Sequence, residues 1–203
     1  MKIPTQRGFT LVETMVALGI FVIVTAIVFV GNSRFNNTIF LTNLAYDLAL
    51  TVSRAQSYGI NVRPFDGATK PFEVGYGVHF KRGPATIDPK ESDNFSFVLF
   101  ADIPVGKNFN HSYEKNATQT EFLERYLIRR GNYISNLSCG VGALADSASI
   151  DVTFLRPDPD ANFYCNGSLS NASLVGIEVT SPAGIKKNVT IEATGQISVQ
   201  SVQ

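Results

Sequence analysis

The sequence predicts an α+β protein in which a long N-terminal helix, first transmembrane and then amphipathic, packs on an antiparallel β-sheet head. Three observations support this fold class. An apolar run extends from Phe9 to Val30, an amphipathic segment follows it, and the rest of the chain alternates short apolar stretches with turn residues. With 203 residues the chain is long enough for one domain with a core and a helical extension.

The apolar run has the length of a membrane span. A helix rises about 1.5 Å per residue and a bilayer core is about 30 Å thick, so roughly 20 residues cross it. Lys2 and Arg7 precede the run and indicate that this end stays in the cytoplasm. The body from Asn32 onward then faces outward.

A secretory signal peptide and a plain signal anchor are the competing interpretations of the run. Val28 to Gly31 is a poor cleavage site for a secretory signal, which favours small residues after a shorter apolar stretch. Against a plain anchor stands Glu13, the single acid in the run. An acid costs about 2.5–3.5 kcal/mol at the centre of a membrane helix and less near its end.

The stretch RGFTLVE, from Arg7 to Glu13, resembles the processing and methylation motif of type IV prepilins and of the related type II secretion pseudopilins. The resemblance implies a basic leader, residues 1–8, that is cleaved after Gly8. Phe9 then becomes a methylated N-terminus, and residues 9–31 form a transmembrane and filament-core helix. It also implies a type IV pilin-like fold.

In this family the acid corresponding to Glu13 pairs with the terminal amine of an adjacent subunit. Phe9 and Glu13 are four residues apart, so we expect them to share a helical face. The resemblance implies four kinds of partner: a prepilin peptidase and methylase, other pilin or pseudopilin subunits, the inner-membrane assembly platform and the membrane itself. It places the protein as a single-pass inner-membrane protein with its head outside, and later in a pilus or pseudopilus on the cell surface or in the periplasm.

Residues 32–60 form the amphipathic half of the predicted helix. Leu41, Leu44, Leu48 and Val52 recur at steps of three and four residues, and Gly59 suggests a stop near Ser57. The stretch from Leu44 to Arg63 also resembles the second half of the N-terminal helix in H-type minor pseudopilins.

Residues 61–203 are predicted to form a β-rich globular head. Residues 72–80 alternate apolar and polar positions, which predicts a strand with one polar face that includes His79. Further strands are predicted at 95–102, around 125–129, at 149–155, and in a C-terminal meander with turns at SPAG and TG. Residues 82–94 and 104–120 are predicted to be long polar loops.

Cys139 and Cys165 are the only cysteines and are expected to form a disulfide outside the cytoplasm. We expect no metal site and no cofactor. For Asp158 and Asp160, and for the acids of residues 88–93, a solvated turn is favoured over a calcium site.

We expect the protein not to be an enzyme, because no nucleophile or acid motif accompanies His79 or His111. Lys plus Arg and Asp plus Glu are equal at 17 each, so no nucleic-acid partner is expected. The sequence therefore favours a structural subunit, a minor pilin or pseudopilin, with a major subunit left open. The alternative is a surface adhesion or DNA-uptake module of a competence pilus.

Overall fold

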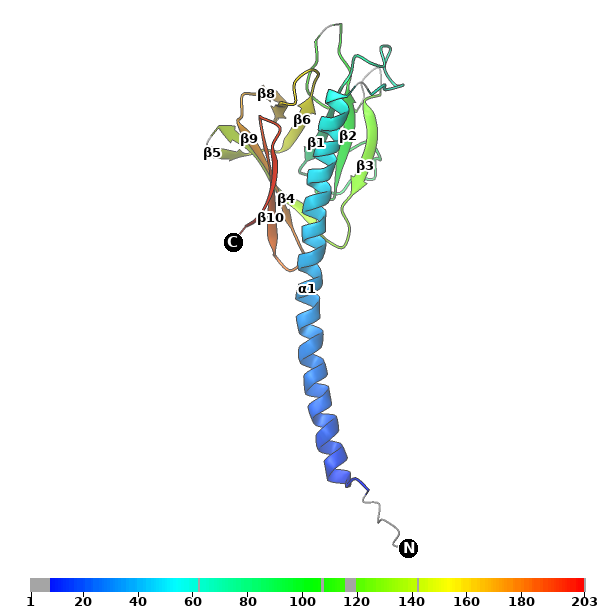
Figure 1. Cartoon of the computed structure of the whole chain (residues 1–203), viewed down its shortest axis with the longest axis vertical. Coiled ribbons are helices and arrows are strands. Elements are labelled where there is room, and N and C mark those ends of the chain that lie inside the picture. Colours follow the sequence, from blue (N-terminus) through cyan, green and yellow to red (C-terminus); the bar gives the residue numbers. More distant parts are fainter. Residues whose placement is uncertain (1–7, 62, 107, 116–119, 142, 203) are drawn as a thin grey trace.

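A computed structural model describes residues 8–61, 63–106, 108–115, 120–141 and 143–202, without the side chains of 30–35 and 143. One helix, α1 (Leu11–Ile60), starts near the N-terminal end and runs up into a β-rich head (Figure 1). Its lower part projects away from the head. The α+β class with a long N-terminal helix and antiparallel sheets is confirmed.

The upper part of α1 forms because apolar residues recur on one side of it. Its stripe has no exposed surface at Leu41, Ala45, Leu48, Val52 and Ala55. This is the periodicity that a helix needs to bury one face and expose the other. The prediction of an amphipathic half is confirmed.

The predicted helix end was wrong by a few residues. The helix continues to Ile60, and Asn61 ends it by donating from its backbone N–H to Ser57 O (3.0 Å). Gly59 is an ordinary helical residue and not a left-handed stop. A Cβ there would lie 2.5 Å from Phe154 O, so this glycine allows the helix to approach a strand closely.

The head contains two antiparallel sheets. The first has six strands in the order β3 (Phe122–Leu127), β2 (Ser96–Asp102), β1 (Gly75–Lys81), β6 (Ser149–Phe154), β7 (Ala161–Cys165) and β8 (Ser168–Ser170). The second has five, in the order β11 (Ile197–Val202), β10 (Lys186–Glu192), β9 (Leu174–Thr180), β4 (Tyr133–Val141) and β5 (Ala143–Asp146).

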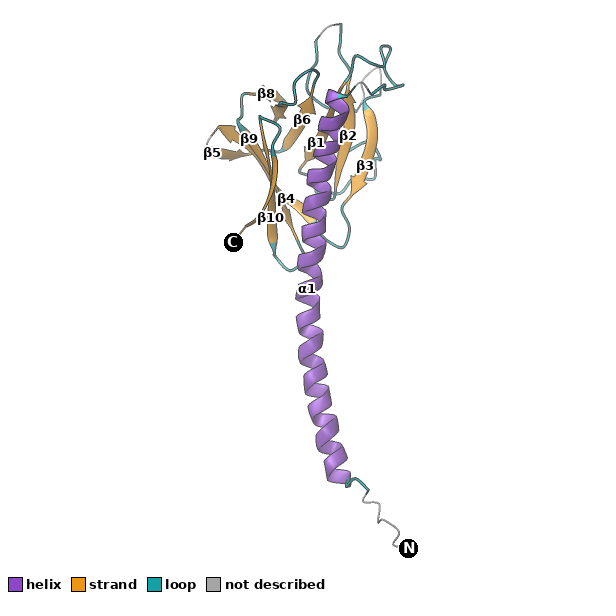
Figure 2. Cartoon of the chain, viewed as in Figure 1, coloured by secondary structure: helices purple, strands orange, loops and turns teal. Residues whose placement is uncertain are grey.

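The core lies where α1 meets both sheets (Figure 2). The helix contacts β1 and β6 of the first sheet and β10 and β11 of the second. Phe80, Phe154 and Val189 are fully buried members of the resulting cluster. Each sheet therefore covers part of the apolar stripe, and the helix joins the two sheets.

The outer face of the first sheet, opposite α1, is also covered. All seven residues of β2 are buried, and His79 of β1 is largely buried. The face of residues 72–80 that was predicted to be polar is therefore covered by other residues within β1 and does not face solvent there. The segment 108–115, predicted only as loop, lies on this face, where the Tyr113 ring contacts the rings of His79 and Phe100.

Other strand predictions had mixed outcomes. The strands near 95–102 and 149–155 and the three-stranded C-terminal meander are confirmed. The strand expected around 125–129 lies instead at 122–127, and residues 128–132 turn into β4. No strand was predicted for β4, β5, β7 or β8, because β4 is rich in Ser, Asn and Gly, and the other three are short and lack clear apolar alternation.

Candidate processing and assembly site

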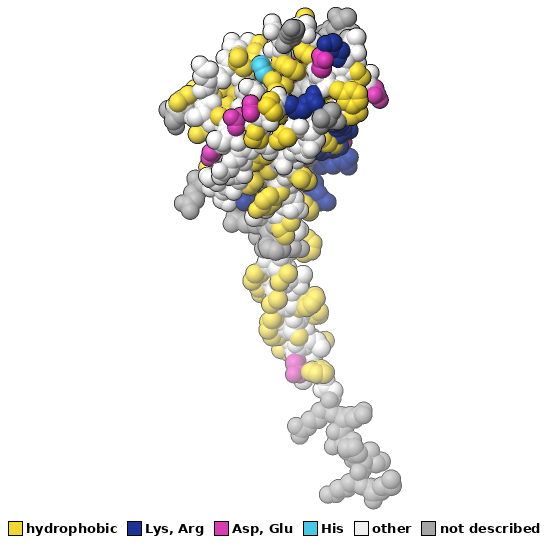
Figure 3. Space-filling model, turned by 45° about the horizontal axis from the view of Figure 1, so that its top comes forward, with side chains coloured by type: hydrophobic (Ala, Val, Ile, Leu, Met, Phe, Trp, Pro, Cys, Tyr) yellow, Lys and Arg dark blue, Asp and Glu magenta, His cyan; other side chains and the backbone are white. Residues whose placement is uncertain are grey.

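The lower part of α1, residues 11–29, is called the stalk here. It has a mean hydropathy of 2.5, and none of it is buried within the chain. Its 19 residues correspond to about 28 Å of helix, close to the thickness of a bilayer core. Apolar side chains cover much of the stalk on the face shown in Figure 3. It is therefore long and apolar enough to anchor the protein in a membrane.

The helix begins directly after the predicted cleavage point. Thr10 is its N-cap, with extended backbone angles (φ −78°, ψ 153°), and its Oγ1 accepts a hydrogen bond from the Glu13 N–H at 3.3 Å. Thr10 and Glu13 match the T-x-x-E pattern of a capping box. This spacing of Thr and Glu is visible in the sequence alone.

Gly8 and Phe9 lie outside the helix and are exposed. Phe9 is 81% exposed, and a Cβ at Gly8 would have nothing within 4 Å. An open approach of this kind suits a cleavage site. The leader residues before Gly8, including Lys2 and Arg7, lie outside the described residues.

The structure does not place Phe9 and Glu13 on one helical face. The helix starts at Leu11 and Thr10 is extended, so the spacing of four residues does not have its helical meaning here. Within one subunit, Glu13 therefore lies in the first helical turn, while Phe9 lies in the segment that precedes the helix.

The comparisons with known proteins concern this same region. A family model described as the prokaryotic N-terminal methylation motif matches residues 3–29. This chain carries the N-terminal methylation motif characteristic of type IV prepilins and pseudopilins. No curated protein and no solved structure matches the chain.

The match covers residues 3–8, which belong to the predicted leader, and the whole stalk. Proteins that carry it are generally structural subunits and not enzymes. The upper part of α1 and the head, beyond residue 29, lie outside the match, so their properties must come from the structure. The H-type similarity of residues 44–63 stays a prediction.

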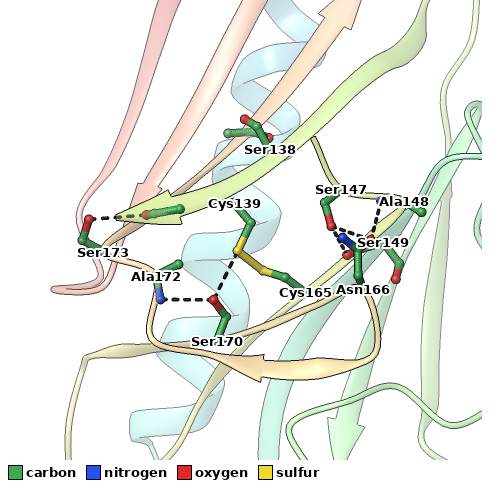
Figure 4. Close-up of a disulfide and its surroundings, with 12 residues drawn as sticks. Ser138, Cys139, Ser147, Ala148, Ser149, Cys165, Asn166, Ser170, Ala172 and Ser173 are labelled. Carbon is green, nitrogen blue, oxygen red and sulfur yellow. Dashed lines mark hydrogen bonds between the residues drawn. A yellow bond between two sulfur atoms is a disulfide. The ribbon is translucent and has the colours of Figure 1, made fainter. Parts of the chain in front are cut away.

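The head has a disulfide between Cys139 and Cys165 (Figure 4). Cys139 belongs to β4 of the second sheet and Cys165 to β7 of the first, with their Cα atoms 6.6 Å apart. Ser170 of β8 lies beside the bond, with its Oγ 3.6 Å from Cys139 Sγ. The disulfide therefore links the two sheets covalently, through the strand next to the edge strand in each sheet.

The acids of residues 88–93 are held by basic side chains. Lys115 Nζ lies 2.6 Å from Asp88 Oδ2, and its hydrogen bond lowers the pKa of that carboxyl. The buried Asp93 pairs with Arg125 at 3.1 Å. Across the described residues, no group of three or more His, Cys, Asp and Glu side chains is arranged to hold a metal ion.

His79 lies under segment 108–115 and His111 belongs to that segment, and each histidine contacts a residue of β6. His79 Nδ1 is 2.6 Å from Asp151 Oδ1, and His111 Nδ1 is 3.1 Å from Thr153 Oγ1. Burial lowers the pKa of His111. Sequence reasoning missed this cluster because β1 and β6 pair His79 with Asp151 across 72 positions of the chain.

Proposed function

We propose that the protein is a structural subunit, a minor pilin or pseudopilin, that is cleaved after Gly8, methylated on Phe9 and assembled into a type IV pilus or type II secretion pseudopilus. The observation that carries the proposal is the methylation motif on an exposed apolar stalk. The implied units are a leader (1–8), a filament-core helix (9–31), an amphipathic half (32–60) and a head (61–203).

The stalk needs an apolar environment that the chain does not supply. Its exposed apolar side chains favour a bilayer first, and the helices of other subunits after assembly. In this scheme a prepilin peptidase removes the leader in the inner membrane. An assembly platform then moves the processed subunit into the filament, with the head outside the cytoplasm.

In this proposal Glu13 pairs with the terminal amine of a neighbouring subunit. An unpaired carboxylate in a helix bundle without water costs several kcal/mol, and a cationic partner offsets most of that cost. The capping-box pattern offers a rival role, in which the Glu13 carboxylate only stabilises the start of its own helix by accepting from the Thr10 N–H. The hydrogen bond present in the structure is the other one of the box, from the Glu13 N–H to Thr10 Oγ1.

Substitutions at Glu13 separate the two roles. We expect Glu13→Val to leave cleavage and the head intact and to reduce entry into filaments strongly. Glu13→Gln keeps the capping-box pattern and loses the charge, so it should still be impaired if pairing matters. The measurement is the ratio of sheared-filament protein to membrane protein, with cleavage checked separately.

The matched control is Thr10→Ala, which removes the cap and keeps the carboxylate. If Thr10→Ala reduces filament entry as much as Glu13→Val does, capping explains the effect. If Glu13→Val enters filaments as wild type does, the assembly role is wrong.

Processing has its own test. A bulky replacement of Gly8 should block cleavage, whereas Gly8→Ala should permit some, because the peptidase must fit the end of the leader closely. The readout is N-terminal sequencing of membrane-extracted protein from a host with a prepilin peptidase. Wild-type protein that keeps Met1 in that host would overturn the proposal.

A further inference from the structure

Segment 108–115, called the cover here, is attached to the outer face of the first sheet through buried carboxyl groups. The backbone N–H of His111 donates to Asp102 Oδ2 (3.2 Å), and that of Tyr113 donates to Asp151 Oδ1 (3.3 Å). The N–H of Glu114 donates to Glu121 Oε2 (2.8 Å). Three backbone groups of the cover thus depend on three acids.

These acids are unusually buried for side chains that ionise. Asp102, Glu121 and Asp151 are at most 3% exposed. Asp102 Oδ1 has no hydrogen-bond partner among the described residues. When Asp102 ionises here, it loses its water, its Oδ1 has no donor, and its charge is repelled by the neighbouring acids Asp151 and Glu121.

Each element that packs around the three acids contributes charged or titratable side chains to their surroundings. β1 contributes His79, and β2 and β6 contribute Asp102 and Asp151. The cover contributes His111, Tyr113, Glu114 and Lys115, and the 82–94 loop adds Asp88, Lys90 and Glu91. Lys115 is already paired with Asp88 and Glu91, so this cation is engaged at the rim of the cluster.

Burial raises the pKa of Asp102 to about 7 and that of Glu121 to about 8; the N–H donors of His111 and Glu114 act in the opposite direction but are outweighed, and nearby acids add to both shifts. If the pKa values of Asp102 and Glu121 are raised while the cover lies on the sheet, the closed state, then low pH favours closure. That contribution is lost as the pH rises through about 7 for Asp102 and about 8 for Glu121. His111, with its lowered pKa, opposes closure once the pH falls below its ordinary value near 6.5.

We propose that the cover is a pH-responsive latch, closed on the sheet near neutral and mildly acidic pH and released under alkaline conditions. Release exposes the outer face of the first sheet, with His79, Phe100 and Thr153, and so changes the surface that the head presents. The latch depends on the head alone and does not require the proposed assembly function.

Hydrogen exchange of the full-length chain in detergent tests the latch. The amides of residues 110–114 are compared at pH 6.5 and pH 8.5, after correction for intrinsic exchange rates, with a β9 peptide as internal reference. We expect their protection to fall about tenfold or more, since one unit of pKa shift corresponds to about a tenfold change in the closing equilibrium.

The double variant Asp102→Asn, Glu121→Gln keeps the shape and removes the ionisation. It should hold the cover closed at both pH values, with less than about a threefold change. Glu73→Gln, at an exposed acid outside the cluster, is the matched control and should behave as wild type. Equal protection in wild type at both pH values, or an unreduced change in the double variant, would overturn the proposal.

Discussion

The two halves of α1 are one continuous helix, yet they meet different surroundings. In the upper half, apolar residues form one stripe that the two sheets bury completely. In the stalk, apolar residues point in all directions and none is buried. A stripe is what a helix needs to dock on its own head, whereas an apolar surface all round needs an environment outside the chain. The same helix therefore stabilises the fold at one end and at the other presents an apolar surface that is long enough to cross a membrane.

The largest change in head stability is expected at one of two leucines that lie two positions apart in the upper half. Leu48 is fully buried and Leu50 is 68% exposed. Leu48→Ala should lower the free energy of unfolding of the head by about 2–5 kcal/mol, because it leaves a cavity between helix and sheets. Urea unfolding of the full chain, followed by near-ultraviolet circular dichroism, measures this change.

Leu50→Ala is the control and should change stability by no more than about 0.5 kcal/mol. If both leucines cost the same, the distinction between a buried stripe and an open face is wrong.

The disulfide provides the second test, because it joins the sheets on which the upper half packs. Removing it with Cys139→Ser and Cys165→Ser should lower head stability by about 3.5 kcal/mol on the chain-entropy estimate for this loop. The stalk should still insert into membranes as before. The same unfolding measurement on wild-type protein under reducing conditions is the control. A loss below about 1 kcal/mol would mean that the two sheets are held together by the core alone.

Two glycines of α1 sharpen the comparison further. Gly59→Ala should destabilise the head by about 1–3 kcal/mol, since the added Cβ would meet Phe154 O at 2.5 Å. In the stalk, a Cβ added at Gly19 would have nothing within 4 Å, so Gly19→Ala should leave head stability unchanged. Thermal unfolding of both variants checks this pair. A stable Gly59→Ala variant would show that helix and strand can separate without cost.

The smallest effect should occur at the cap of the stalk. Thr10→Ala removes the acceptor for the Glu13 N–H and should cost about 0.5–2 kcal/mol, confined to the first helical turn. Hydrogen exchange of the first turn in detergent should become faster, while the upper half keeps its protection. Faster exchange throughout α1 would contradict the independence of the two halves.

Some predictions failed for a reason that lies in long-range contacts. Gly59 has the local look of a helix stop, but Phe154 lies across the chain and requires a residue without a side chain there. His79 occupies a polar position of an alternating strand, yet the cover buries it beside Asp151. Both errors came from judging a residue by its neighbours in sequence when a distant segment decides its surroundings.

The sequence by itself determined the features that depend on local order. Spacing along one helix accounts for the apolar run with Glu13, for the T-x-x-E pattern at its start and for the stripe from Leu41 to Ala55. Only the tertiary structure decided the division of the strands into two sheets, the place of the disulfide between them and the buried acids beneath the cover. Helical periodicity repeats every few residues and is visible in a short window, whereas strand pairing joins segments dozens of residues apart and is settled only when the core forms.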